Sequence, residues 1–202
     1  MAGAGGKRRL DESAVKTQYP ARTGIGADPS GRHRPDGSHR RCDRMEVGIK
    51  WPNDILFNGK KLVGILTEMD CDMETIHSVT VGMGINVNTK AFPEELESIA
   101  TSLYLESGRE YDRAELVGQA MVHFEALYAE FLEQGGTFAP FKERYCAKCL
   151  NIGKEVRVIG SETYLAVALD ITPEGELIVK RKDNGAEEVV FSGEVSIRGE
   201  EK

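Results

Sequence analysis

Residues 46–70 read EVGIKWPNDILFNGKKLVGILTEMD, and their pattern predicts strands joined by tight turns. The apolar side chains of EVGIKW and of DILF predict two short strands. Asn58-Gly59 separates the second strand from KLVGILTEMD, and this dipeptide is the strongest short-range signal for a β-hairpin turn. A further strand is predicted at residues 75–82, TIHSVTVG. Short turns between such strands indicate an antiparallel sheet with one covered face.

Helices are predicted downstream of this sheet. Pro93 begins a short helix, and Asp112 with Glu115 has the spacing of a capping box. In the long helix that follows, apolar residues recur at helical spacing, and we expect them to pack in the core: Val117, Ala120, Met121, Phe124, Leu127, Tyr128, Phe131 and Leu132. Gly135-Gly136 ends that helix, and a last helix is predicted at about residues 138–150.

After Gly153 the apolar period falls to two. EVRVIG, TYLAVALDI, GELIVKR and EEVVFSG are four short predicted strands. Glycine-containing turns separate them, at residues 160–161, 173–175 and 183–185. Closely spaced short strands of this kind predict a small barrel.

Residues 1–44 differ in composition from the rest of the chain. They hold seven Gly and three Pro, lack apolar periodicity and carry a formal charge of +5, against −12 for residues 45–202. Such a segment buries too little apolar surface to offset the entropy of ordering, so a mostly disordered basic tail is predicted. The total charge of −7 makes nucleic-acid binding an unfavoured interpretation, and the tail lacks interleaved aromatic residues.

The cysteines do not predict a metal site. Cys146 and Cys149 form a single C-x-x-C pair, and the histidines do not lie beside it at zinc-finger spacing. We therefore expect free thiols and no bound structural metal. With no signal peptide and no apolar run of 18 residues, a cytoplasmic protein outside the membrane is expected.

Three segments carry the candidate chemistry. They are KWPND at residues 50–54, GKKLVGIL at residues 59–66 and GMGINVN at residues 82–88. In this order and spacing they closely resemble the biotin–protein ligase family. SGEVSIR at residues 192–198 resembles the last strand of that family's C-terminal domain, so the resemblance covers about residues 46–202.

The resemblance implies an α+β fold. Residues 45–150 would form part of a class II synthetase-like catalytic domain, with a mixed or antiparallel sheet and helices, and residues 151–202 an SH3-like barrel. It also implies an enzyme that uses ATP to form biotinyl-5′-AMP and then transfers biotin to a lysine of a biotin carboxyl carrier protein of a carboxylase. Mg²⁺ is expected with the substrates ATP and biotin, and two copies of the chain are expected to pair through the central sheet.

The resemblance also implies which residues act. Negative charge crowds between a carboxylate and a phosphate, so a fixed cation is needed there. Lys61 matches the catalytic lysine of the family, Lys50 is the second candidate cation, and Lys60 is expected to face solvent because strand alternation points it away from Lys61. The expected biotin-binding residues are Lys61, Gly82, Met83, Gly84 and Trp51, where a core position for Trp51 is an equal alternative. The expected nucleotide-binding residues are Asn53, Asn86, Glu194 and Arg198.

One segment of the family has no match in the sequence. A Gly/Arg-rich biotin-binding loop of the form G-R-G-R-x-G-R precedes KWPND in the family, and residues 1–44 do not contain it. The alternative hypothesis is therefore an inactive, truncated or frame-shifted ligase remnant that lacks this loop.

Overall fold

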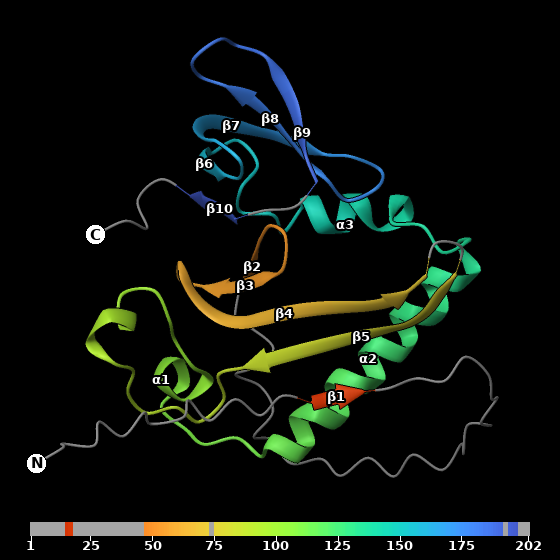
Figure 1. Cartoon of the computed structure of the whole chain (residues 1–202). Coiled ribbons are helices and arrows are strands. Elements are labelled where there is room, and N and C mark those ends of the chain that lie inside the picture. The colour runs from red at the N-terminus through yellow and green to blue at the C-terminus, as the bar shows by residue number, and fades with distance from the viewer. Residues whose placement is uncertain (1–14, 18–46, 73–74, 192–193, 198–202) are drawn as a thin grey trace, which may run out of the picture.

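The structure, a computed structural model, describes residues 15–17, 47–72, 75–191 and 194–197. These residues form two antiparallel five-stranded sheets, with helices between the sheets in the sequence (Figure 1). The strand order is β1-β5-β4-β3-β2 in the first sheet and β10-β6-β7-β8-β9 in the second. The fold class is α+β, as predicted, with a β-rich C-terminal region.

The first sheet is built on the hairpin that the sequence predicts. Its strands are β2 (Val47–Lys50), β3 (Asp54–Phe57), β4 (Lys60–Cys71) and β5 (Ile76–Ile85). Asn58 and Gly59 join β3 to β4 with φ angles of 50° and 79°. Both values are positive, as a type I′ hairpin turn requires. The pairing of β3 with β4 is irregular between Ile55 and Leu56, immediately before this turn.

A short strand from the N-terminal segment also belongs to this sheet. β1 (Val15–Thr17) pairs antiparallel with β5, with Val15 opposite Met83 and Thr17 opposite Val81. These three residues lie within the segment predicted to be a mostly disordered tail, and the sequence did not predict this strand. A three-residue strand held by backbone pairing leaves no periodic signal in the sequence. The rest of the predicted tail lies outside the described residues.

The helices lie between the two sheets in the sequence. They are η2 (Glu94–Leu96), α1 (Leu103–Ser107) and α2 (Arg113–Glu133). The predicted N-cap is confirmed, because the Asp112 carboxylate accepts hydrogen bonds from the backbone N–H groups of Ala114 and Glu115, at 2.8 and 3.4 Å. Within the described part of the chain, no helix is both long and apolar enough to cross a membrane.

The expectation that the apolar stripe of α2 is core is wrong for the second half of the helix. Leu127, Tyr128 and Leu132 are 47%, 48% and 57% exposed. The rings of Phe124, Tyr128 and Phe131 instead stack on one another along the helix, with centroids 6.0 and 6.2 Å apart. Helical spacing shows that one face is apolar, but it does not show whether another element covers that face.

The C-terminal region begins with short helices and continues as the second sheet. η3 (Ala139–Phe141) and α3 (Lys142–Cys146) replace the longer helix predicted at residues 138–150. The strands are β6 (Glu155–Ile159), β7 (Thr163–Ile171), β8 (Leu177–Arg181), β9 (Glu187–Val190) and β10 (Glu194–Ile197). Alternate side chains point inward and form one apolar core, in which Val156, Ala166, Ala168, Ile171, Leu177 and Val179 are fully buried.

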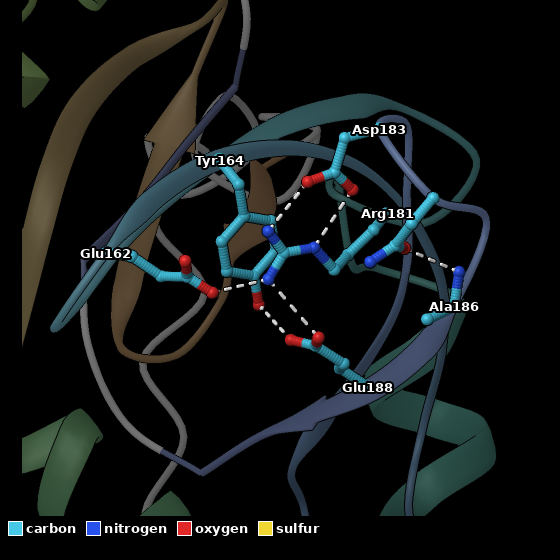
Figure 2. A network of polar contacts seen from close by, with 7 residues as sticks. Glu162, Tyr164, Arg181, Asp183, Ala186 and Glu188 are labelled. Carbon is cyan, nitrogen blue, oxygen red and sulfur yellow. Dashed lines mark hydrogen bonds and ion pairs between the residues drawn. The ribbon is translucent and has the colours of Figure 1, made fainter.

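An ion-pair network fastens the edge of this sheet (Figure 2). The Arg181 guanidinium contacts the carboxylates of Glu162, Asp183 and Glu188 at 2.5, 2.8 and 3.3 Å. It also lies over the ring of Tyr164, 4.0 Å from the centroid, and the Tyr164 hydroxyl donates to Glu188. Burial, and next the hydrogen bond to Glu188, raise the pKa of Tyr164 to about 12. The network joins β7, β8 and β9 through a single planar cation, and we assign it a structural role.

Candidate functional site

The predicted catalytic lysine forms an ion pair with the last residue of KWPND. Lys61 Nζ lies 2.6 Å from Asp54 Oδ1, and the two side chains are 48% and 21% exposed. Lys50 ends β2 directly opposite Asp54, which begins β3. Paired residues of an antiparallel sheet share a face, so the second candidate cation lies on the same face as Asp54. The structure therefore brings Lys50, Asp54 and Lys61 together.

The backbone of Lys61 is fixed from both sides. Lys61 lies opposite Leu56 of β3 on one side. On the other side its N–H donates to the carbonyl of Ile99 at 2.7 Å, and its carbonyl accepts from Thr101 N–H at 2.9 Å. These bonds fix the point from which the Lys61 side chain extends, and the ammonium group itself is held by Asp54.

Glycines make room for the lysine side chain. A Cβ on Gly64 would lie 2.9 Å from Lys61 Cε and 3.1 Å from Lys61 Nζ. Gly84 lies opposite Gly64 in the adjacent strand, and Gly82 lies opposite Leu66. These residues share the face that carries Asp54. Without side chains, Gly64, Gly82 and Gly84 leave a strip of open backbone beside Lys61, which we call the glycine strip.

Met83 lies on the opposite face of the sheet. It pairs with Ile65 and, with Ile85 and Val87, lines an apolar pocket against the first turns of α2. The helix contributes to this pocket Arg113, Leu116, Val117, Ala120 and Met121. The predicted biotin-binding residues are therefore divided, with Lys61, Gly82 and Gly84 on one face and Met83 on the other.

The two predicted nucleotide-binding asparagines flank this site. Asn53 Nδ2 donates to the carbonyl of Ile65 at 2.5 Å, and Ile65 N–H donates to the carbonyl of Asn53 at 2.9 Å. Asn86 follows β5 directly, and its backbone is tied to Leu62 and Leu103. Both residues therefore lie on segments bonded to β4, within a few residues of Lys61.

Trp51 lies in the core of the C-terminal sheet. It is 3% exposed and belongs to the apolar cluster that includes Val156 and Val179. Its indole Nε1 donates to the carbonyl of Gly175 at 2.9 Å, and its peptide bond to Pro52 is cis. Of the two expectations for this residue, its burial favours the core position over the wall of a biotin pocket.

The ion pair between Lys61 and Asp54 does not include the remaining predicted residues that the structure describes. Glu194 begins β10, opposite Ile159, and Arg198 lies outside the described residues. Lys60 Nζ donates to the carbonyl of Glu97 at 2.8 Å, so this lysine is held by the end of η2 and takes no part in the Lys61 ion pair. Cys71, Cys146 and Cys149 are free thiols, and no group of three or more metal-ligating side chains occurs among the residues that the structure describes.

Asp54 is the site residue that sequence reasoning did not identify. Its carboxylate is the nearest anionic partner that the structure gives Lys61. The signal was present in the sequence, because Asp54 ends the KWPND motif and strand pairing brings it opposite Lys50. Its contact with Lys61 depends on the irregular register before the Asn58-Gly59 turn, which the sequence pattern does not report.

Two family models match the chain. The Biotin/lipoate A/B protein ligase family matches residues 15–86, and the Biotin protein ligase C terminal domain matches residues 152–198. The first match begins at β1, upstream of residue 46, where the resemblance of the motifs begins.

Known proteins similar to this chain agree with these models. Bifunctional ligase/repressor BirA of Bacillus spizizenii is 42% identical over 69% of this chain and 43% of its own length. Biotin–[acetyl-CoA-carboxylase] ligase of Mycobacterium tuberculosis is 36% identical over 73% of this chain and 51% of its own. A solved structure, biotin protein ligase from Aquifex aeolicus in complex with biotin and ATP, has a TM-score of 0.65 at 30% identity, covering 75% of this chain and 62% of that one. The chain spans about half the length of the curated relatives that it matches.

Proposed function

The chain belongs to the biotin protein ligase family, and from that premise we propose that it is an ATP-dependent ligase that attaches biotin to a lysine of a biotin carboxyl carrier protein. The observation that carries this proposal is the position of Lys61. Its ammonium is held by Asp54 above Gly64, beside the glycine strip on an open face of the sheet.

The proposed first step is adenylation. A carboxylate oxygen of biotin attacks the α-phosphorus of ATP and forms biotinyl-5′-AMP, and pyrophosphate leaves. An ammonium group has three donors, so Lys61 can keep one hydrogen bond to Asp54 and direct the other two at the carboxylate and the phosphate. This charge-assisted contact stabilises the negative charge that gathers as the two anions meet. Lys50, on the same face, is proposed as the second cation.

The two proposed substrate positions both lie beside Lys61. Biotin is assigned to the glycine strip, where Gly82 and Gly84 permit close approach to the backbone. The nucleotide is assigned to the side of Asn53 and Asn86, whose amides offer both donors and acceptors. The family resemblance adds Glu194 and Arg198 to the nucleotide side. Mg²⁺ is proposed to arrive with ATP, because this ion takes substrate phosphates and water as most of its ligands.

The second step is transfer to the carrier. The amine of the acceptor lysine attacks the mixed anhydride, an amide forms, and AMP leaves. The proposed partner is the carrier domain of a carboxylase, with which the enzyme would meet in the cytoplasm. Pairing of two copies of the chain through the first sheet is a further proposal.

Biotin transfer in vitro tests this function. The purified chain is incubated with biotin, MgATP and a carrier domain, and biotin on the carrier is detected by blotting. Lys61→Ala is expected to lower the labelling rate by about 100-fold or more, because it removes the preorganised cation. Lys60→Ala is the matched control: it makes the same change of charge one position away, and we expect it to retain most of the activity.

The outcome separates the ligase from the inactive remnant. Labelling by the wild-type chain that is lost in Lys61→Ala and kept in Lys60→Ala supports the proposal. No labelling by the wild-type chain, under conditions in which a full-length ligase labels the same carrier, contradicts it and favours the remnant. Equal loss in both lysine variants would show that net charge, and not the position of Lys61, matters.

A further inference from the structure

The turn at residues 51–53 of the KWPND motif connects Lys50 to Asp54, two charged residues of the proposed site. Lys50 ends β2 and Asp54 begins β3, so residues 51–53 set where both side chains lie. Asp54 in turn anchors Lys61 at 2.6 Å. Any group that fixes the turn therefore acts on all three charges of the site without touching a substrate.

The C-terminal half of the chain holds this turn by three hydrogen bonds. Asn151 Oδ1 accepts from the backbone N–H of Trp51 at 2.7 Å, and the carbonyl of Gly175 accepts from the indole of Trp51 at 2.9 Å. The hydroxyl of Tyr145 donates to the carbonyl of Pro52 at 3.1 Å. These partners are 93 to 124 positions away from the turn in the sequence.

Asn151 occupies the centre of this contact. Its side chain is fully buried, and its Oδ1 also lies 3.9 Å from Cys149 Sγ. The residues just before it run beside β2, since Ile49 N–H donates to the carbonyl of Lys148 and Leu150 N–H donates to the carbonyl of Ile49, both at 2.8 Å. Residues 148–150 thus bond to β2 through their backbone, and the side chain of Asn151 adds the next bond, to Trp51 in the turn.

We propose that Asn151 is a positioning residue for adenylation, through which the C-terminal unit sets the geometry of Lys50, Asp54 and Lys61. This inference rests on the proposed function for its catalytic consequence. Removing the amide oxygen leaves the buried N–H of Trp51 without an acceptor and frees the turn to shift. A displacement of about 1 Å in positioning groups is enough to lower a catalytic rate by about 100-fold.

The test uses the full chain and the single tryptophan that it contains. Asn151→Ala, Asn151→Asp and Val156→Ala are compared by thermal unfolding, by acrylamide quenching of Trp51 fluorescence and by the steady-state kinetics of adenylate formation. Asn151→Asp keeps an acceptor oxygen at this place. Val156→Ala matches the loss of a buried side chain in the same unit without removing a hydrogen bond to the turn.

The proposal predicts a specific pattern. Asn151→Ala lowers kcat for adenylation by about 10- to 100-fold while the KM values for biotin and ATP change by less than about threefold, and it increases quenching of Trp51. Asn151→Asp shows quenching of Trp51 close to that of the wild type and keeps much of the adenylation rate. Val156→Ala lowers the melting temperature but leaves the quenching and the rate unchanged. The proposal is overturned if Asn151→Ala leaves quenching unchanged, or if Val156→Ala produces the same kinetic loss.

Failure of the proposed function gives a different result. If the wild-type chain forms no adenylate, the ligase assignment fails, whereas the quenching measurement still decides whether Asn151 holds the turn. Unchanged quenching in Asn151→Ala then overturns the positioning role on structural grounds alone.

Discussion

At the scale of single residues, the site depends on one charge contact and on the absence of one side chain. Lys61 is predicted from the sequence because it lies in a specific motif, and its catalytic role stays a proposal. Asp54 could not be assigned to it, because the contact arises only when the irregular β3–β4 register places the two side chains together. The role of Gly64 also appears only in the structure, because the side chain of Lys61 fills the space that a side chain at residue 64 would need.

Gly64→Ala is expected to reduce activity without unfolding the protein. The added Cβ would lie 2.9 Å from Lys61 Cε, and the flexible end of the lysine must move away from Asp54. We expect the rate of biotin transfer to fall by about 10- to 100-fold, as in other cases of misplaced catalytic groups. Gly118→Ala is the matched control, because nothing lies within 4 Å of its added Cβ and alanine favours a helix. Equal activity of the two variants in the blotting assay would contradict the assigned position of Lys61.

At the scale of elements, prediction succeeded where the signal was local. The Asn58-Gly59 turn and the Asp112 cap are set by the residues themselves, and the structure shows both. The aromatic stripe of α2 was predicted to be core because its spacing is helical, but its burial depends on elements distant in sequence. The strand β1 was missed for the complementary reason, because three residues pair through their backbone alone.

A charged side chain in the second half of α2 is therefore expected to have little effect on stability. Leu132 is 57% exposed, so Leu132→Lys should change the free energy of unfolding by no more than about 0.5 kcal/mol. Leu177→Ala, at a fully buried position of β8, should cost about 2–5 kcal/mol. Urea unfolding followed by circular dichroism measures both values. A loss of more than about 1 kcal/mol in Leu132→Lys would mean that this face of the helix is covered in solution.

The contact between α3 and β7 is expected to weaken in acid. Lys142 Nζ donates to Asp170 Oδ2 at 2.8 Å, and this hydrogen bond is the main cause that lowers the pKa of Asp170. A lowered pKa in the folded state means that the stabilisation is present above the ordinary value of 3.8 and is lost as the pH falls through the lower folded value. The stability difference between wild type and Asp170→Asn should be constant from about pH 5 to 8 and shrink below about pH 4. A difference that instead grows in acid would show that the carboxylate is not stabilised by Lys142.

At the scale of the whole molecule, Trp51 connects the first sheet to the core of the second. Trp51 belongs to the motif of the first sheet by sequence and to the core of the second by burial. A lone tryptophan in a motif gives no indication of which core it enters, because its partners Asn151 and Gly175 are 100 and 124 positions away. The motifs could thus be identified from the sequence. The contact of Trp51 with the core of the second sheet could not.

Shared burial of this kind predicts a single unfolding transition. The fluorescence of Trp51 reports on the junction, and far-UV circular dichroism reports on both sheets. We expect the two signals to have the same urea midpoint, as two-state unfolding requires. A fluorescence midpoint well below that of circular dichroism would show that the junction opens before the sheets unfold.

The two-residue hairpin between β3 and β4 also limits how this protein can diverge. Side chains alternate along a strand, so the loss or gain of one residue in the hairpin would turn every following side chain of β4 to the other face. Lys61 would then point toward the face that α2 covers, away from Asp54, which lies before the hairpin in β3. A single-codon insertion or deletion in this segment would therefore remove the proposed site while leaving the composition of the strand almost unchanged.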